Sequence, residues 1–162
     1  MSFDEFLAII QKHFGFLFDT LGGRVSYSRV WDATYESYSV GIDTPSFRVL
    51  FKKEEGGFPI FLGPPDADFD DDKDWWSEGH WVNVHSLVRY VTGKDADWSN
   101  LETKPYPEQV AGVFSTTAQS VASLAERFRE MFASPKALSE WKPSFDTYLR
   151  NRVADTPDAK TD

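Results

Sequence analysis

The residues whose types could best take part in binding or chemistry lie in one stretch, residues 66–81, which reads DADFDDDKDWWSEGHW. Between positions 66 and 78 it holds seven acids and one base, so it carries −6 of the chain's formal net charge of −9. Phe69, Trp75, Trp76 and Trp81 are interleaved with these acids. Protein-binding surfaces combine large aromatic anchors with charge that attracts a partner of opposite sign. The stretch therefore favours binding of a basic protein.

In this interpretation the aspartates attract the partner and two adjacent tryptophans anchor it. The predicted partner-binding residues are Asp68, Asp70, Asp71, Asp72, Asp74, Trp75 and Trp76. Two simpler interpretations remain open. The segment could be a solvated acidic loop without a partner, or its rings could fold back into the core, which we expect for Trp81 and leave open for the tryptophan pair.

The spacing of Asp66, Asp68 and Asp70 invites comparison with a calcium loop, in which oxygen ligands occupy positions 1, 3 and 5. In that frame position 6, which requires glycine, is Asp71, and position 12, which requires glutamate, is Ser77. An EF-hand is therefore not expected. A divalent-metal-binding or hydrolytic protein that uses the same acids remains an alternative.

Other signatures of catalysis are weak. His80 and His85 are five residues apart, so they would not share a helix face, and no third ligand for zinc or nickel is implied. The chain lacks a Gly-x-Ser-x-Gly elbow, a Gly-x-x-x-x-Gly-Lys phosphate loop and a His-Glu-x-x-His motif. We therefore predict a non-enzymatic protein without a metal or cofactor.

Composition narrows the class of protein. The 162 residues suit one domain, which we place at 1–153, and the polar residues 154–162 are expected to be a disordered tail. Cysteine is absent, no apolar run approaches the roughly 20 residues that span a bilayer, and the N-terminus lacks a basic signal region. The negative net charge argues against nucleic acid and anionic membranes as partners. We expect a cytoplasmic protein.

Residues 46–63, SFRVLFKKEEGGFPIFLG, predict a β-hairpin. Phe47, Val49 and Phe51 alternate with Arg48, Leu50 and Lys52, the two-residue period of a β-strand. Two glycines supply the turn. Two further strands are expected at 24–31 and 35–43, which gives a four-stranded antiparallel meander. Because Pro59 has no N–H, its strand is expected to lie at an edge or at least to donate no hydrogen bond at that point. As an edge strand, residues 58–62 would be the natural interface if the protein is a homodimer or a structural homo-oligomer.

Helical patterns surround these strands and complete an α+β fold. A capping box at Ser2 and Glu5 starts an apolar helix that ends at residues 22–23. After the strands, helices are predicted at 84–91 and, from Pro107, at 107–132. A last helical segment begins at Pro135, and Pro143 is expected to kink it or to split it in two.

Residues 14–22, FGFLFDTLG, the tyrosine-rich strands and residues 47–51, FRVLF, carry a resemblance to a known group. In the order and aromatic placement of its first 90 or so residues, the chain resembles small bacterial proteins grouped with the immunity proteins of toxin systems. The resemblance implies a compact α+β protein that neutralises a toxin by binding it. It implies no catalytic residues, and the C-terminal helices lie outside it.

Overall fold

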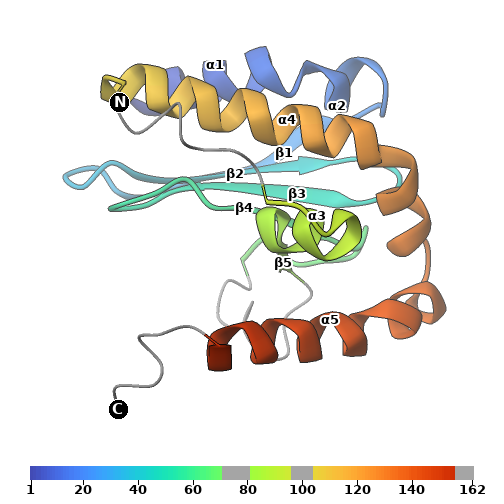
Figure 1. Cartoon of the computed structure of the whole chain (residues 1–162). Helices are drawn as coiled ribbons and strands as arrows, with labels where there is room; N and C mark the ends of the chain where they lie inside the picture. The colour runs from blue at the N-terminus through green and yellow to red at the C-terminus, as the bar shows by residue number, and fades with distance from the viewer. Residues whose placement is uncertain (71–80, 96–103, 156–162) are drawn as a thin grey trace.

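The computed structural model describes residues 1–70, 81–95 and 104–155. Helices and an antiparallel sheet combine in an α+β fold, as predicted (Figure 1). In chain order the elements are α1 (Phe3–His13), α2 (Gly15–Asp19), β1 (Arg24–Asp32), β2 (Ser37–Asp43), β3 (Arg48–Lys53), β4 (Ile60–Gly63), β5 (Val82–Asn83), α3 (Val84–Thr92), α4 (Tyr106–Met131) and α5 (Pro135–Asp155).

The sheet is an antiparallel meander in the order β1-β2-β3-β4-β5, so it has five strands where four were predicted. The additional strand, β5, has two residues, too few to show an alternating pattern, and its Val82 pairs with Leu62. Because β4 lies between β3 and β5, the prediction that residues 58–62 form an edge is wrong. Pro59 lies just before β4, where its missing N–H interrupts no bond within the strand.

One face of the sheet packs against helices α1 and α4 (Figure 1). Phe47, Val49 and Phe51 are all buried in this core, as the alternation predicted. Leu50 between them is buried on the opposite face, so β3 is covered on both faces rather than on one. Phe51 contacts Phe14 edge to face with ring centroids 4.8 Å apart, and it stacks on Phe114 of α4 at 6.1 Å. Each such ring contributes about 1.5–3 kcal/mol by leaving water, so these aromatics join the sheet to the helices.

The N-terminal helix begins as predicted and ends earlier. The Ser2 hydroxyl accepts a hydrogen bond from the Glu5 N–H (3.2 Å), and the Glu5 carboxylate accepts one from the Ser2 N–H (2.6 Å). The predicted single helix is interrupted at Phe14, which has φ −106° and ψ 27°, and α2 starts at Gly15. Glycine weakens a helix at this point, and the break allows Phe14 and Leu17 both to enter the core.

Three helices follow the sheet, within the predicted number. The side chain of Asn83 caps α3 by accepting hydrogen bonds from two backbone N–H groups, and Pro107 lies in the first turn of α4. Helix α5 packs against α3 through Tyr90 and Phe145, whose ring centroids are 5.4 Å apart. It also packs against the end of α4, where the Trp141 indole donates to the Met131 carbonyl (2.8 Å).

Helix α5 runs through Pro143 as one helix, so of the two predicted effects of this proline, a kink or a split, the split does not occur. It also includes residues 154–155, which the sequence had placed in the polar tail, whereas residues 156–162 lie outside the described part of the chain. None of the helices described here combines the length and the apolar character needed to cross a membrane.

Candidate protein-binding site

The acidic segment begins and ends on the sheet face opposite α1 and α4. Leu50 and Phe61 point to this face and form a second apolar cluster with Ala67, Phe69 and Trp81. Tyr27 of β1 packs against the cluster from the side. The prediction that Trp81 folds back into the core is therefore confirmed, and Phe69 is buried beside it.

Two glycines of the sheet provide the space in which these rings lie. A Cβ atom on Gly41 would come within 2.5 Å of the Phe69 ring. A Cβ atom on Gly63 would come within 2.9 Å of both the Ala67 Cβ and the Trp81 ring. Real Cβ atoms essentially never make such contacts, so the rings could not lie where they do over any larger residue.

The rings hold the two ends of the acidic segment at one place. The Phe69 and Trp81 ring centroids are 5.4 Å apart, and the Trp81 indole N–H donates to the Asp68 carbonyl (2.9 Å). Phe69 also stacks on Tyr27, with centroids 5.4 Å apart and ring planes 12° from parallel. The chain leaves the sheet after Gly63, and residues 68–69 lie next to Trp81, the residue before β5.

Arg48 of β3 ties the start of the segment to the sheet. Its Nε donates to the Asp43 carboxylate (3.0 Å), its terminal N–H donates to the Ala67 carbonyl (2.5 Å), and its guanidinium lies 4.9 Å from the Phe69 ring centre. One side chain thus neutralises an acid, satisfies a loop carbonyl and contacts an anchoring ring. This role of Arg48 was not predicted from the sequence.

Asp70 is the acid that contacts β1. Its carboxylate accepts a hydrogen bond from the Tyr27 hydroxyl (3.1 Å) and lies 3.6 Å from the Arg29 guanidinium. Burial of Tyr27 and its hydrogen bond to this carboxylate raise the pKa of the phenol. The Asp70 side chain still has 67% of its surface exposed, so its charge remains available to a partner.

The predicted binding residues fall into two groups. Asp68 and Asp70 are exposed, and they lie beside the buried rings at the start of the segment. Asp71, Asp72, Asp74, Trp75 and Trp76 lie outside the described residues, so their role stays a prediction.

The described acids do not converge on a common point. The Asp68 carboxylate accepts the Asp70 backbone N–H (2.9 Å), whereas the Asp70 carboxylate faces β1. Within residues 1–70, 81–95 and 104–155 no three acids or histidines are arranged to hold a metal ion. His85 lies half-buried at the start of α3, where its backbone N–H donates to the Asn83 side chain, and burial lowers its pKa.

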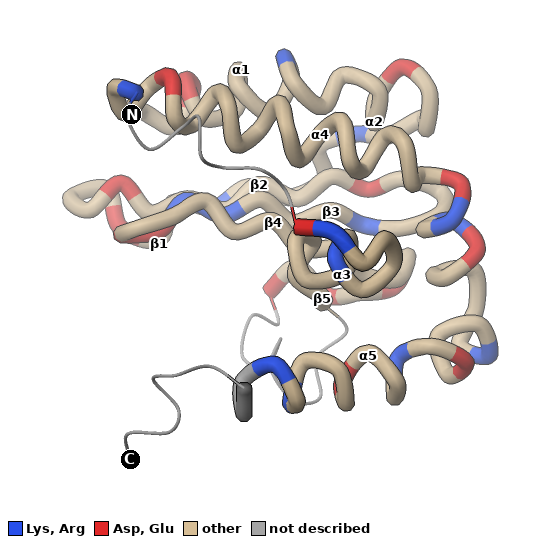
Figure 2. Tube along the Cα trace, in the orientation of Figure 1, with Lys and Arg blue, Asp and Glu red and all other residues tan. Residues whose placement is uncertain are grey.

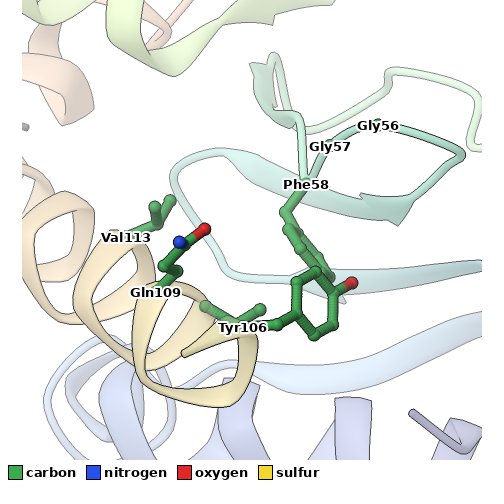
Figure 3. A pocket seen from close by; sticks show the side chains of 7 residues that line it. Gly56, Gly57, Phe58, Tyr106, Gln109 and Val113 are labelled. Atoms are coloured by element: carbon green, nitrogen blue, oxygen red, sulfur yellow. The ribbon is translucent and has the colours of Figure 1, made fainter. Parts of the chain in front are cut away.

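A separate pocket of about 320 Å³ lies between the β3–β4 turn and the start of α4 (Figure 3). The Phe58 and Tyr106 rings lie side by side in it with centroids 6.0 Å apart, and the Gln109 amide donates to the Lys104 carbonyl (2.6 Å). Among the described residues that line it, Tyr106 is the one that titrates, and burial raises its pKa. The described lining therefore offers no acid or base near neutral pH. Its lining comprises Gly56, Gly57, Phe58, Tyr106, Gln109, Val110 and Val113.

Comparisons with models of protein families, with curated proteins and with solved structures found no match to this chain. The resemblance to immunity proteins accordingly stays a prediction, and the acidic segment with its two buried rings is the feature from which function is argued.

Proposed function

We propose that this protein is a non-enzymatic binding domain whose acidic segment, residues 66–81, binds a basic partner protein. The observation that carries the proposal is the burial of Phe69 and Trp81 side by side over Gly41 and Gly63. A segment fixed at both ends loses less conformational freedom when a partner binds than a free chain would, so more of the contact energy becomes affinity.

Charge supports the same proposal. The segment carries −6 of the net charge of −9, and Asp68 and Asp70 display part of it on an exposed surface. In the described part of the chain, Lys and Arg are scattered along the trace (Figure 2). A concentrated negative charge of this kind speeds the encounter with a basic protein and makes the association rate sensitive to salt.

The partner we propose is a toxin with a basic active surface, for example one that acts on nucleic acid. Such a surface must attract phosphate groups, so an acidic segment that covers it would block the natural substrate. The protein would then act as an immunity-type inhibitor by occupation of that surface, without chemistry of its own.

The test compares two variants of equal net charge. In one, Asp70, Asp71, Asp72 and Asp74 are replaced by Asn. In the other, four acids of α4 and α5 that are exposed and distant in sequence are replaced by Gln: Glu108, Glu126, Glu130 and Glu140. Each immobilised protein is used to capture partners from the native lysate at low and high salt, and binding rates are then measured with the purified captured protein.

We expect the Asn variant to associate at least tenfold more slowly than the native protein and to lose most of the salt dependence, because attraction at a distance acts on the association rate. The Gln variant should retain most of the native rate. If both variants associated more slowly than the native protein and to the same extent, the net charge alone would matter. If neither variant associated more slowly than the native protein, the binding site would lie elsewhere.

A further inference from the structure

The outer edge of β1 is the longest unpaired strand edge in the described part of the molecule. β1 lies at one end of the sheet and has nine residues, whereas the strand at the other end, β5, has two and leads directly into α3. An unpaired strand edge displays backbone N–H and C=O groups that another strand can bond. β1 is therefore the place where this sheet can be extended.

Exposed apolar side chains gather at the same edge. Among the described residues, five large hydrophobic side chains are exposed, and four of them belong to β1 or to the turn that follows it: Val25 (39% exposed), Val30 (51%), Trp31 (38%) and Tyr35 (65%). Apolar surface that is concentrated on a strand edge marks a site of association.

We propose that a second copy of this chain pairs with β1 in antiparallel orientation, with the two-fold axis at Ser28, so that the two sheets become one. The register of β1 on β2 is irregular between Val25 and Tyr27 and between Val30 and Asp32, so residues 27–30 form the regular centre of the strand. Pairing at Ser28 places Tyr27 of each copy opposite Arg29 of the other, so no like charges meet next to the axis. Within each copy Arg29 lies 3.6 Å from the Trp31 ring centre and 3.6 Å from the Asp70 carboxylate.

The remainder of the strand is complementary to itself about the same centre. Arg24 and Asp32 lie four residues before and after Ser28, outside the regular part of the strand, so opposite charges fall in the same region at both ends of the paired strands. Val25 and Trp31 lie three residues away on either side, so apolar groups approach each other as well. Pairing about Arg29 would instead set two arginines against each other, which is unfavourable. Charge complementarity therefore favours a second copy of the chain as the occupant, and pairing about Ser28 over pairing about Arg29.

The test uses Ser28, whose side chain is exposed and would meet its own copy at the axis. Sedimentation equilibrium of the native chain should show reversible growth of the mean mass toward twice 18.5 kDa as concentration rises. Ser28→Lys and Ser28→Glu each place like charges at the axis, so each should weaken dimerisation at least tenfold. Mixed together, they should form a heterodimer that native mass spectrometry identifies by its mass.

Circular dichroism of each variant checks that it is folded, and recovery of the heterodimer on mixing requires that both are. A native chain that stays monomeric at the highest soluble concentration would overturn the proposal. A dimer that tolerates both charges, or two variants that do not recombine, would overturn it equally, because the interface would then lie elsewhere. These outcomes are independent of whether the acidic segment binds a basic protein.

Discussion

At the scale of single residues, Gly41 and Gly63 determine whether the acidic segment stays attached to the sheet. Neither has the positive φ that glycine alone adopts easily, in contrast to Gly22, Gly56 and Gly93. Their value lies in the missing side chain, because the Phe69 and Trp81 rings occupy the space that a Cβ would need.

Replacement of Gly41 by Ala should therefore displace the Phe69 ring. We expect a loss of about 1–3 kcal/mol in the free energy of unfolding, the usual cost of overpacking, and faster proteolytic cleavage between residues 70 and 81. Denaturant unfolding and limited proteolysis measure the two effects. Gly15→Ala is the control, since its Cβ would meet nothing closer than 3.9 Å, and it should leave both unchanged or stabilise the helix. Similar results for the two variants would contradict the assigned role of Gly41.

Part of the candidate site could be predicted from the sequence at this scale. The excess of acidic residues can be counted directly in the sequence. Burial of Trp81 could be expected because a large apolar ring is stabilised by leaving water. The parts that were missed depend on distance in space. Arg48 contacts Ala67 and Phe69 only because β3 runs beneath the segment, and Gly41 looks like an ordinary strand residue until the Phe69 ring lies over it.

At the scale of elements, α5 contains a proline in its interior. Pro143 lies inside the helix, and its side chain is exposed. It can form no N–H hydrogen bond to the preceding turn, and a proline in a helix interior is about 3 kcal/mol less favourable than alanine.

Pro143→Ala should therefore stabilise the protein, by about 2 kcal/mol once the greater freedom of the unfolded chain is allowed for. Thermal or denaturant unfolding measures the change. Pro135→Ala is the matched control, because Pro135 is the first residue of α5, where proline loses no hydrogen bond, and this variant should be neutral or slightly less stable. A destabilised Pro143→Ala protein would mean that α5 depends on a bend at this position.

The elements also show where reading the sequence succeeds. Long periodic patterns, such as those of β2, β3 and α4, predicted the observed elements because alternation or helical spacing repeats many times. The two-residue strand β5 offers no repeat, and its pairing with β4 is what removes β4 from the edge. Likewise, the apolar stripe continues through residue 21, so only the packing of Phe14 and Leu17 reveals the break between α1 and α2.

At the scale of the whole molecule, stability should depend on pH through His85. Burial lowers the pKa of this imidazole below its ordinary value of 6.5 in the folded protein. The unfolded chain therefore binds the proton more readily, so the full stability is present above pH 6.5 and is lost as the pH falls toward and through the folded pKa.

We expect the free energy of unfolding to fall between pH 7 and pH 5, and His85→Gln should flatten this dependence. Burial also lowers the pKa of His13, so a His13→Gln protein is measured for comparison. Denaturant titrations at several pH values provide the measurement. An unchanged slope in the His85→Gln protein would assign the pH dependence to other groups.

The convergence of residues 70 and 81 on one spot has a consequence for how such a protein can evolve. The sheet, the helices and the two buried rings define the fold, whereas the chain between those positions is attached at a closed base. On the function proposed above, insertions, deletions and substitutions there would alter what is recognised while the scaffold keeps its stability. Specificity and foldability would then be encoded in separate sets of residues, and we expect that an unrelated peptide grafted between these two positions would be displayed without redesign of the rest.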